Sequence, residues 1–467
     1  MSLMRAGIRV TRNAAAQMKN PIRRVLIANR GEIAVRVIRA CQELGLETVQ
    51  AYSEADAGSL AVRLADSSVC IGHARSAESY LNAPFLVSAA LGRKVDAVHP
   101  GYGFLSENAE FAEMCARAGL IFIGPRADVI RKMGDKSMAR KLAQEAGVQT
   151  TPGSDGNVSG VEEAQAVADN IGYPVILKAA AGGGGRGMRI VSHPRELRTA
   201  FEEAAREAKG AFGDDSIYVE KYLTRIRHIE IQVLADDFNV LHFGERDCSI
   251  QRRNQKLVEE SPSTALTGES RAKFGEAALR LCKHVGYTSA GTVEFILDEV
   301  TGRFYFMEMN TRIQVEHPVT EMVTGIDLVK SQLQIAAGEP LGIAQEQIGM
   351  NGHAIECRIN AEDFENGFMP CPGLITHYRS PGGPGVRIDS HLFSGYTVPP
   401  YYDSLLAKLI CWGRTRGEAL ARMQRALGEL VIDGVKTTAG FHKLLLQHEQ
   451  FQKGQFHTRY VEDVFLS

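Results

Sequence analysis

A run of glycines lies between two strand-like segments in the first half of the chain. Residues 174–179 and 188–191 have the apolar character of strands, and residues 182–185 between them are all glycine. A Walker loop or a dinucleotide-binding fingerprint needs glycines that open a helix, so this run fits neither. It predicts a hairpin whose backbone N–H groups fold over phosphates, with Lys178 neutralising their charge. Four consecutive glycines lose much backbone entropy on folding, which favours a binding role over a flexible surface hairpin.

The second feature is a predicted hairpin formed by residues 291–310. Centring its turn on Thr301 places Glu294 directly opposite Glu308, and Asn310 follows two residues later on the same face. Opposed carboxylates repel each other unless a cation lies between them. Two carboxylates and an amide oxygen are hard ligands that suit Mg²⁺ held jointly with substrate phosphates. A metal site is therefore favoured over a solvated hairpin.

The alternation of polar and apolar side chains continues beyond this hairpin and predicts a strand that reaches Glu316. Its polar face carries Glu308, Asn310, Arg312, Gln314 and Glu316. A row of carboxylate, amide and cationic groups suits a small anion bound beside a metal. Arg312 would clamp the anion and Glu316 would act as a general base.

Three other segments are dense in polar residues, at 228–232, 248–256 and 356–363. Each fits a solvated loop or a half-buried strand as well as it fits a binding site. Lys256 and Arg358 become candidates only because an anion site is predicted nearby.

Strand-like and helix-like segments alternate over the first hundred residues. Strands are expected at residues 25–28, 48–52, 97–99 and 121–123, with a helix at 33–44. This alternation indicates a doubly wound parallel sheet, which binds ligands at the carboxyl ends of its strands.

At 467 residues the chain exceeds a single average domain, so we expect an α/β and α+β multidomain protein. The expected parts are a leader or tag, residues 1–20; an N-terminal α/β domain, 21–123; a helical connector, 124–149; a small unit with three strands around one helix, 150–223; and a C-terminal domain with helices near 321–338 and 417–430, 224–467.

Composition excludes several classes of protein. Hydrophobic residues make up 44% and the net charge is −2, which indicates a globular protein without the basic field of a nucleic-acid binder. Eight cysteines form no CxxC pair, which favours a reducing compartment over disulfides or zinc. No apolar run has the length of a membrane span. The basic residues before Glu32 fit a mitochondrial leader or a tag, and we assign the chain to the cytoplasm.

Nine motifs, in this order, resemble the biotin carboxylase family from about Arg23 to the C-terminus: IANRGEIAVRVIRA, HPGYGFLSEN, MGDKSMAR, KAAAGGGGRGM, EKYL, RDCSIQRRNQK, EMNTRIQVEHPVTE, ECRINAED and YYDSLLAKL. The resemblance implies an ATP-grasp fold, in which an N-terminal doubly wound domain packs on a C-terminal domain and a mobile lid, residues 150–223, closes over ATP. It also implies a ligase that uses ATP and bicarbonate to carboxylate N1′ of carrier-linked biotin through carboxyphosphate, releasing ADP and phosphate.

The resemblance assigns roles position by position. The residues that would contact ATP are Lys136, Lys178, Gly184, Gly185, Glu220, Lys221, Tyr222, Leu223, His228, Gln251 and Asn254. The residues that would hold Mg²⁺ or Mn²⁺ are Glu294, Glu308 and Asn310. Bicarbonate would be bound by Lys256, Arg312, Gln314 and Val315, and deprotonated by Glu316. Arg358 would stabilise the biotin enolate, in a pocket lined by Tyr102 and Gly103.

One position departs from the family. Many members have His where this chain has Asn254. Asparagine keeps a hydrogen-bonding side chain but cannot become cationic, so we expect altered nucleotide affinity and retained activity.

The resemblance further implies partners. The sequence has no AMKM-type biotinyl-lysine motif and no carboxyltransferase region, so a biotin carboxyl carrier protein and carboxyltransferase subunits would be separate. A homodimer is expected, with Arg39, Glu43 and Tyr378 at the contact. Acetyl-CoA carboxylase, in fatty acid biosynthesis, is the expected assembly, while propionyl-CoA, pyruvate or another acceptor is left open.

Three other functions compete with this one. Another ATP-grasp ligase, forming carboxyphosphate for carbamoyl phosphate, shares the metal hairpin but not the Arg358 segment, and it depends on ammonia. A non-catalytic nucleotide sensor would ordinarily have lost Glu316, Arg312 or a metal ligand. A nicotinamide-dependent oxidoreductase is disfavoured because the glycine run opens no helix.

Overall fold

The computed structural model of the protein describes residues 22–179 and 187–466. The glycines Gly184 and Gly185, and the leader predicted at residues 1–20, lie outside the described residues.

The N-terminal part contains a five-stranded parallel sheet, as predicted, with the order β3-β2-β1-β4-β5. Its strands are β1 (Arg24–Ile27), β2 (Glu47–Tyr52), β3 (Ser67–Cys70), β4 (Ala97–His99) and β5 (Ile121–Phe122). The helices are α1 (Gly31–Glu43), α2 (Leu60–Leu64), α3 (Ala83–Gly92) and α4 (Ala109–Arg117), with short 3₁₀ turns at Glu54–Asp56 and Ser76–Glu78. The sequence did not predict β3, because this edge strand is polar and only partly buried.

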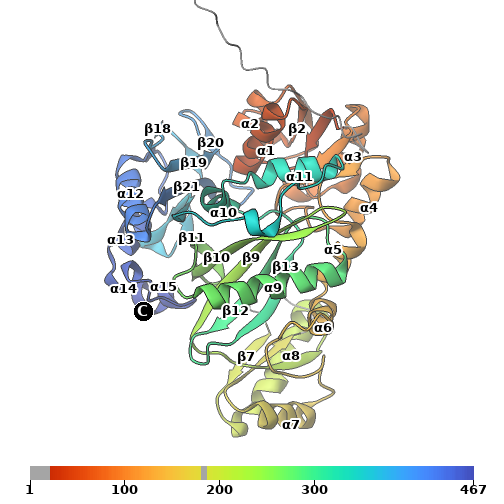
Figure 1. The fold of residues 1–467 in the computed structure, drawn as a ribbon, viewed down its shortest axis with the longest axis vertical. Helices are drawn as coiled ribbons and strands as arrows, with labels where there is room; N and C mark the ends of the chain where they lie inside the picture. The colour runs from red at the N-terminus through yellow and green to blue at the C-terminus, as the bar shows by residue number, and fades with distance from the viewer. Residues whose placement is uncertain (1–21, 180–186, 467) are drawn as a thin grey trace, which may run out of the picture.

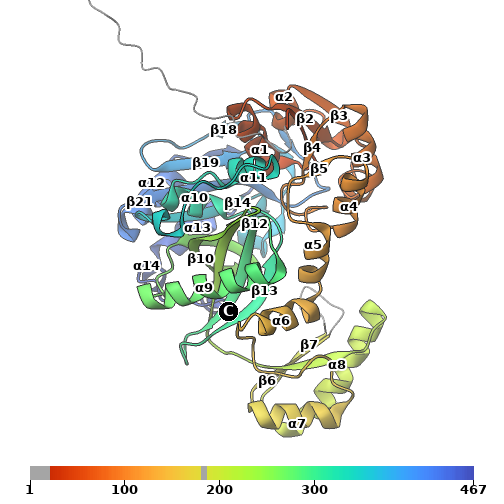
Figure 2. The ribbon, with the colours of Figure 1, turned by 45° about the vertical axis from the view of Figure 1, so that its right-hand side comes forward.

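Two helices lead from this sheet into a smaller unit. They are α5 (Ala127–Gly134) and α6 (Lys136–Glu145), and the side chain of Asp135 caps the second helix by accepting from the amide of Met138. Figure 2 shows them running from the N-terminal sheet toward the small unit at the bottom of the view.

The small unit is a three-stranded antiparallel sheet, in the order β7-β6-β8, with two helices rather than the predicted one. Its elements are α7 (Val161–Ile171), β6 (Val175–Ala179), β7 (Met188–Val191), a 3₁₀ turn at Pro194–Glu196, α8 (Leu197–Phe212) and β8 (Ile217–Lys221). The missed helix α7 buries Val161, Ala164 and Ala168 on one face, a helical spacing that its acidic residues obscure in the sequence.

The largest element is an eight-stranded antiparallel sheet with the order β13-β12-β9-β10-β11-β14-β21-β19, which crosses the centre of the molecule (Figure 1). Its strands are β9 (Ile226–Ala235), β10 (Val240–Arg252), β11 (Gln255–Ser261), β12 (Ser289–Asp298), β13 (Phe304–Asn310), β14 (His353–Asn360), β19 (Val386–Ser390) and β21 (Leu405–Gly413). Three two-stranded pairs accompany it: β15 (Glu362–Asp363) with β16 (Met369–Pro370), β17 (Gly373–Leu374) with β20 (Thr397–Val398), and β18 (His377–Arg379) with β22 (Val431–Asp433).

Helices cover this sheet. They are α9 (Gly268–Val285), α10 (His317–Thr324), α11 (Leu328–Ala336), α12 (Arg416–Glu429), α13 (Ala439–Gln447), α14 (Glu449–Gln452) and α15 (Tyr460–Phe465), with 3₁₀ turns at Gln345–Gln347 and Phe364–Asn366. The helix predicted near 321–338 is two helices, because Gly325 has a left-handed φ of 74° and ends α10. Within the described part of the chain, no helix is both long and apolar enough to traverse a bilayer.

The register of the β12–β13 hairpin agrees with the sequence prediction at the residues that matter. Glu294 pairs with Glu308, whereas Phe295 pairs with Phe306, because a bulge at Met307 shifts the register toward the turn. The predicted continuation of this strand to Glu316 is wrong. Strand β13 ends at Asn310, and the next amide, of Thr311, donates to the side chain of Glu107 rather than to β12.

Candidate active site

A cavity of about 1530 Å³ opens between α6, the small unit, the central sheet and α15. The residues predicted from the sequence that line it are Tyr102, Lys136, Lys178, Glu220, His228, Gln251, Asn254, Lys256, Glu294, Glu308, Asn310, Arg312, Gln314, Val315, Glu316 and Arg358. Four predicted site residues that the structure describes do not line the cavity: Gly103, Lys221, Tyr222 and Leu223.

Three carboxylates surround the ammonium group of Lys256 on β11. Its Nζ lies 2.6 Å from Glu230, 3.0 Å from Glu294 and 2.6 Å from Glu316. These acids come from β9, β12 and the loop before α10, and all three are buried. The charges of Lys256 and its neighbours hold the pKa values of Glu294 and Glu316 well below the usual range, against the effect of burial.

Arg358 on β14 bridges two of the buried acids. Its guanidinium donates to Glu259 at 2.6 Å and to Glu316 at 2.9 Å. Glu316 is thus held by one ammonium and one guanidinium, which keep it ionised and fix its orientation. An ionised carboxylate in this position can accept a proton from a bound substrate.

Glu294, one of the predicted metal ligands, is surrounded by hydrogen-bonding side chains. His228 lies 2.7 Å from one of its oxygens, and Asn310 and Gln314 donate to the other at 2.8 and 2.6 Å. Burial, and then the facing charge of Glu294, raise the pKa of Glu308. This excess of buried negative charge fits a divalent cation bound between the two glutamates.

A second group of possible ligands does not need a metal. His228, Glu230 and Glu294 also present ligand atoms within 4.8 Å of one another. The ammonium of Lys256 already bonds both of these glutamates, so the positive charge is supplied by the protein.

The sequence predicted Arg312 and Glu316 on one face of a strand. In the structure Arg312 instead lies in the loop that follows β13. It donates to Glu107 at 2.8 Å and to Asn310 at 2.9 Å. The loop still turns Arg312, Gln314 and Glu316 into the same cavity, so the predicted side chains meet although the predicted strand is absent.

The small unit supplies a second cationic group. Lys178 on β6 bonds Glu220 on β8 at 2.5 Å, and Arg140 on α6 bonds the other oxygen of Glu220 at 2.8 Å. The ammonium of Lys221 instead donates to the carbonyls of Gly172 and Tyr173, on the side away from the cavity.

Asn254 lies in a two-residue turn between β10 and β11. Arg253 and Asn254 have φ values of 47° and 66°, and Arg252 pairs with Gln255 across the turn. Both φ values are positive, as in a type I′ hairpin, and Asn adopts this conformation more readily than most residues. The turn's backbone therefore accommodates Asn254 without strain, and its side chain still borders the cavity.

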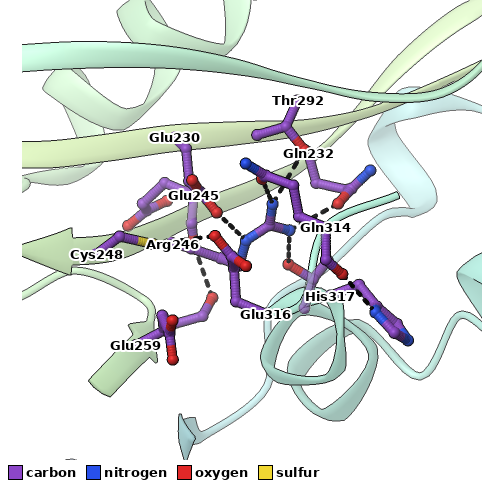
Figure 3. A network of polar contacts seen from close by, with 12 residues as sticks. Glu230, Gln232, Glu245, Arg246, Cys248, Glu259, Thr292, Gln314, Glu316 and His317 are labelled. Carbon is purple, nitrogen blue, oxygen red and sulfur yellow. Dashed lines mark hydrogen bonds and ion pairs between the residues drawn. The ribbon is translucent and has the colours of Figure 1, made fainter. Parts of the chain in front are cut away.

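One buried group at the base of the site was not predicted from the sequence. Arg246 on β10 is fully buried and donates to five side chains: Glu230, Gln232, Thr292, Gln314 and Thr320. Figure 3 shows this guanidinium at the centre of the network, with Glu230, Gln232 and Gln314 around it. The sequence signal was the alternation of Glu230 and Gln232 with apolar residues, which also fits an ordinary half-buried strand.

Three family models cover most of the chain. Residues 21–130 match the biotin carboxylase N-terminal domain, residues 135–344 the ATP-binding domain of the carbamoyl-phosphate synthase L chain, and residues 356–463 the biotin carboxylase C-terminal domain. A biotin carboxylase from Bacillus subtilis is 57% identical over 442 residues, which cover 94% of this chain and 98% of that protein. The chain belongs to the biotin carboxylase family.

Solved structures agree with this assignment. A biotin carboxylase complex from Campylobacter jejuni has a TM-score of 0.90 and 50% identity, covering 95% of this chain and 99% of that one. The biotin carboxylase domain dimer of Hydrogenobacter thermophilus 2-oxoglutarate carboxylase, in complex with MgADP, ADP and bicarbonate, has a TM-score of 0.89 and 52% identity, covering 95% and 97%. The fold is therefore the ATP-grasp fold of biotin carboxylases, and the chain is an ATP-dependent ligase.

Proposed function

We propose that this biotin carboxylase uses ATP and bicarbonate to carboxylate N1′ of biotin on a separate carrier protein, with carboxyphosphate as the intermediate. The observation that supports this most is the single cavity in which the acid pair Glu294 and Glu308 lies beside Lys256, Glu316 and Arg358. A metal–phosphate site and an anion site with a built-in base are what phosphoryl transfer to bicarbonate requires.

The nucleotide end is formed by Lys178, Lys136 and His228, with Gln251 and Asn254 at its border. Lys178 and Lys136 would neutralise phosphate charge. Glu294, Glu308 and Asn310 would hold Mg²⁺ or Mn²⁺. The metal, when bound, neutralises the charge that develops on the transferred phosphoryl group. Arg140 and Lys178 hold Glu220 between them, which fixes that carboxylate at the cavity wall.

At the anion end, Lys256, Arg312, Gln314 and Val315 would bind bicarbonate and Glu316 would take its proton. In the structure Glu316 shares Lys256 and Arg358 with other buried acids. A bound anion would interact with the same two cations and so weaken their interaction with Glu316. Its pKa would then rise toward a value better suited to a base.

Arg358 would stabilise the enolate form of biotin, and Tyr102 borders the same cavity at that end. The protein's contribution is to position charged groups and exclude water, because the phosphate leaving group can accept the biotin proton.

We also propose the cellular setting. Acetyl-CoA carboxylase in the cytoplasm is the assembly we favour, with separate carrier and carboxyltransferase subunits. The 2-oxoglutarate carboxylase relative shows that the family serves other acceptors. A homodimer is proposed because that relative is a dimer; here Arg39 and Glu43 are exposed on α1, and Tyr378 is half-buried.

The decisive experiment measures ADP release with Mg²⁺, with and without bicarbonate and free biotin, for the wild type, Glu316→Gln and Glu346→Gln. The last variant is the matched control, because Glu346 is exposed and outside the cavity lining. We expect bicarbonate-dependent, biotin-stimulated turnover that Glu316→Gln lowers by roughly 10²–10⁴-fold and the control leaves unchanged.

Two results would contradict the proposal. Turnover that ignores biotin and responds to ammonia would assign the chain to the carbamoyl-phosphate type of chemistry. Tight ATP binding without turnover under any of these conditions would identify a nucleotide sensor.

A further inference from the structure

A second buried lysine lies behind the active site. Lys408 is the only charged residue of the apolar strand β21, and its side chain is 0% exposed. A buried ammonium is very costly unless it is both paired and hydrogen-bonded, so its partners indicate what it does.

Those partners come from three different parts of the fold. The ammonium donates to the carbonyl oxygen of Val315 at 2.8 Å and lies 3.1 Å from Glu32 and 3.9 Å from Asp389. Asp389 on β19 pairs with Lys408 across the sheet, and Arg358 on β14 pairs with it on the other side. The three charged side chains therefore form one row on a single face of the sheet.

One contact leads to the predicted biotin end. Glu32 is the second residue of α1, and its Oε1 atom accepts both from the hydroxyl group of Tyr102 and from Lys408. Its other oxygen is buried without a hydrogen-bond partner among the described residues. The position of Tyr102 at the cavity wall thus depends on a carboxylate that Lys408 holds.

The other contact leads to the predicted bicarbonate end. The carbonyl of Val315 belongs to the peptide that joins Val315 to Glu316, in the irregular loop between β13 and α10. In the described structure this loop belongs to no strand, since β13 ends at Asn310. The ammonium of Lys408 therefore sets the orientation of a peptide directly beside the proposed base.

We propose that Lys408 is a positioning residue that couples the biotin end of the cavity to the bicarbonate end. It holds Tyr102 through Glu32, and it holds the Val315–Glu316 peptide directly. This inference rests on the proposed function. Lys408 itself is not among the described residues that line the cavity, so it acts on the substrates only through these neighbours.

The test measures KM for bicarbonate, biotin and ATP, together with kcat, in Lys408→Met, Glu32→Gln and the double variant. We expect Lys408→Met to raise KM for bicarbonate and for biotin by roughly tenfold each, the value of one hydrogen bond to a charged group, with KM for ATP little changed. Glu32→Gln should raise KM for biotin most and KM for bicarbonate several-fold, and the double variant should be no worse than Lys408→Met. The control is Lys273→Met, which removes an exposed, ion-paired lysine outside the cavity lining.

The alternative is a purely structural role. Lower thermal stability with all three KM values unchanged, or additive effects in the double variant, would overturn the coupling. If Lys408→Met fails to fold, Tyr102→Phe is the second test, because it keeps Lys408 and removes the hydrogen bond from Tyr102 to Glu32. It should raise KM for bicarbonate several-fold, and an unchanged value would overturn the proposal. Wild-type turnover that depends on bicarbonate and biotin tests the proposed function separately, so the two failures are distinguishable.

Discussion

Glu294 and Glu308 lie directly opposite each other in the register of β12 and β13, and within the described part of the chain donors surround Glu294 but not Glu308. The facing charge and burial raise the pKa of Glu308. The protein thus holds two like charges together on adjacent strands, which is unfavourable until a cation joins them.

The first prediction concerns this pair. Glu308→Gln should raise the Mg²⁺ concentration needed for half-maximal ATP hydrolysis by at least about tenfold, because a carboxylate ligand is lost. In EDTA the same variant should be more stable by about 0.2–1 kcal/mol, because the repulsion is removed. A magnesium titration and a urea unfolding curve measure the two effects. An unchanged magnesium requirement would remove Glu308 from the metal site, and Glu346→Gln should change neither quantity.

The second prediction concerns the cation at the centre of the site. Lys256→Met leaves Glu230, Glu294 and Glu316 without their shared ammonium, which should destabilise the protein by about 3–5 kcal/mol at pH 8. The wild-type pKa values of Glu294 and Glu316 are depressed, so the stability they contribute is present above the unfolded pKa and is lost as pH falls through the folded pKa. The deficit of the variant should therefore shrink toward pH 5, where its carboxylates take up protons.

Chemical denaturation at pH 5 and pH 8 checks this. Adding Glu294→Gln to Lys256→Met should recover part of the lost stability, because Glu294, unlike Glu230 and Glu316, keeps no arginine partner among the described residues once Lys256 is gone. A deficit that is equal at both pH values would show that packing, and not charge, is what Lys256 contributes.

The sequence patterns predicted the site residues better than they predicted the strands and loops that carry those residues. The pairing of Glu294 with Glu308 could be predicted from the symmetry of the hairpin, because it depends only on residues close together in sequence and on the two-residue period of a strand. The strand expected to reach Glu316 does not form, because the amide of Thr311 finds Glu107, which is 204 residues away in sequence. Arg246 and Lys408 were not predicted for the same reason, since each has partners that only the folded sheet brings together.

The third prediction concerns the turn at Asn254. Asn254→His should change KM for ATP by a few-fold and leave kcat for bicarbonate-dependent turnover largely intact, because both residues tolerate positive φ and both form hydrogen bonds. Asn254→Val should destabilise the protein by about 1–2 kcal/mol, because a β-branched residue is strained at this φ. Nucleotide kinetics and thermal unfolding of both variants test the two statements. A large loss of kcat in the histidine variant would show that Asn254 has a role beyond nucleotide affinity.

The last prediction concerns Glu356, which faces Glu259 across β11 and β14. Neither oxygen of Glu356 has a hydrogen-bond partner among the described residues. Burial raises its pKa well above the usual range, and burial likewise raises the pKa of Glu259 to about 7. An acid whose folded pKa is raised binds its proton more tightly when folded. The stability of the protein therefore falls as pH rises from the unfolded pKa through the folded pKa.

Glu356→Gln replaces this acid with a neutral group of the same shape. The variant should match the wild type near pH 5 and become more stable by about 1–3 kcal/mol near pH 9, where the wild type must bury an uncompensated charge. Urea unfolding at pH 5, 7 and 9 measures the difference, and Glu346→Gln should show none at any pH. If the variant is instead destabilised increasingly as pH rises, the Glu356 carboxylate is ionised in the folded protein and stabilised by the nearby cations Lys408 and Arg358, which lower its pKa against the effect of burial.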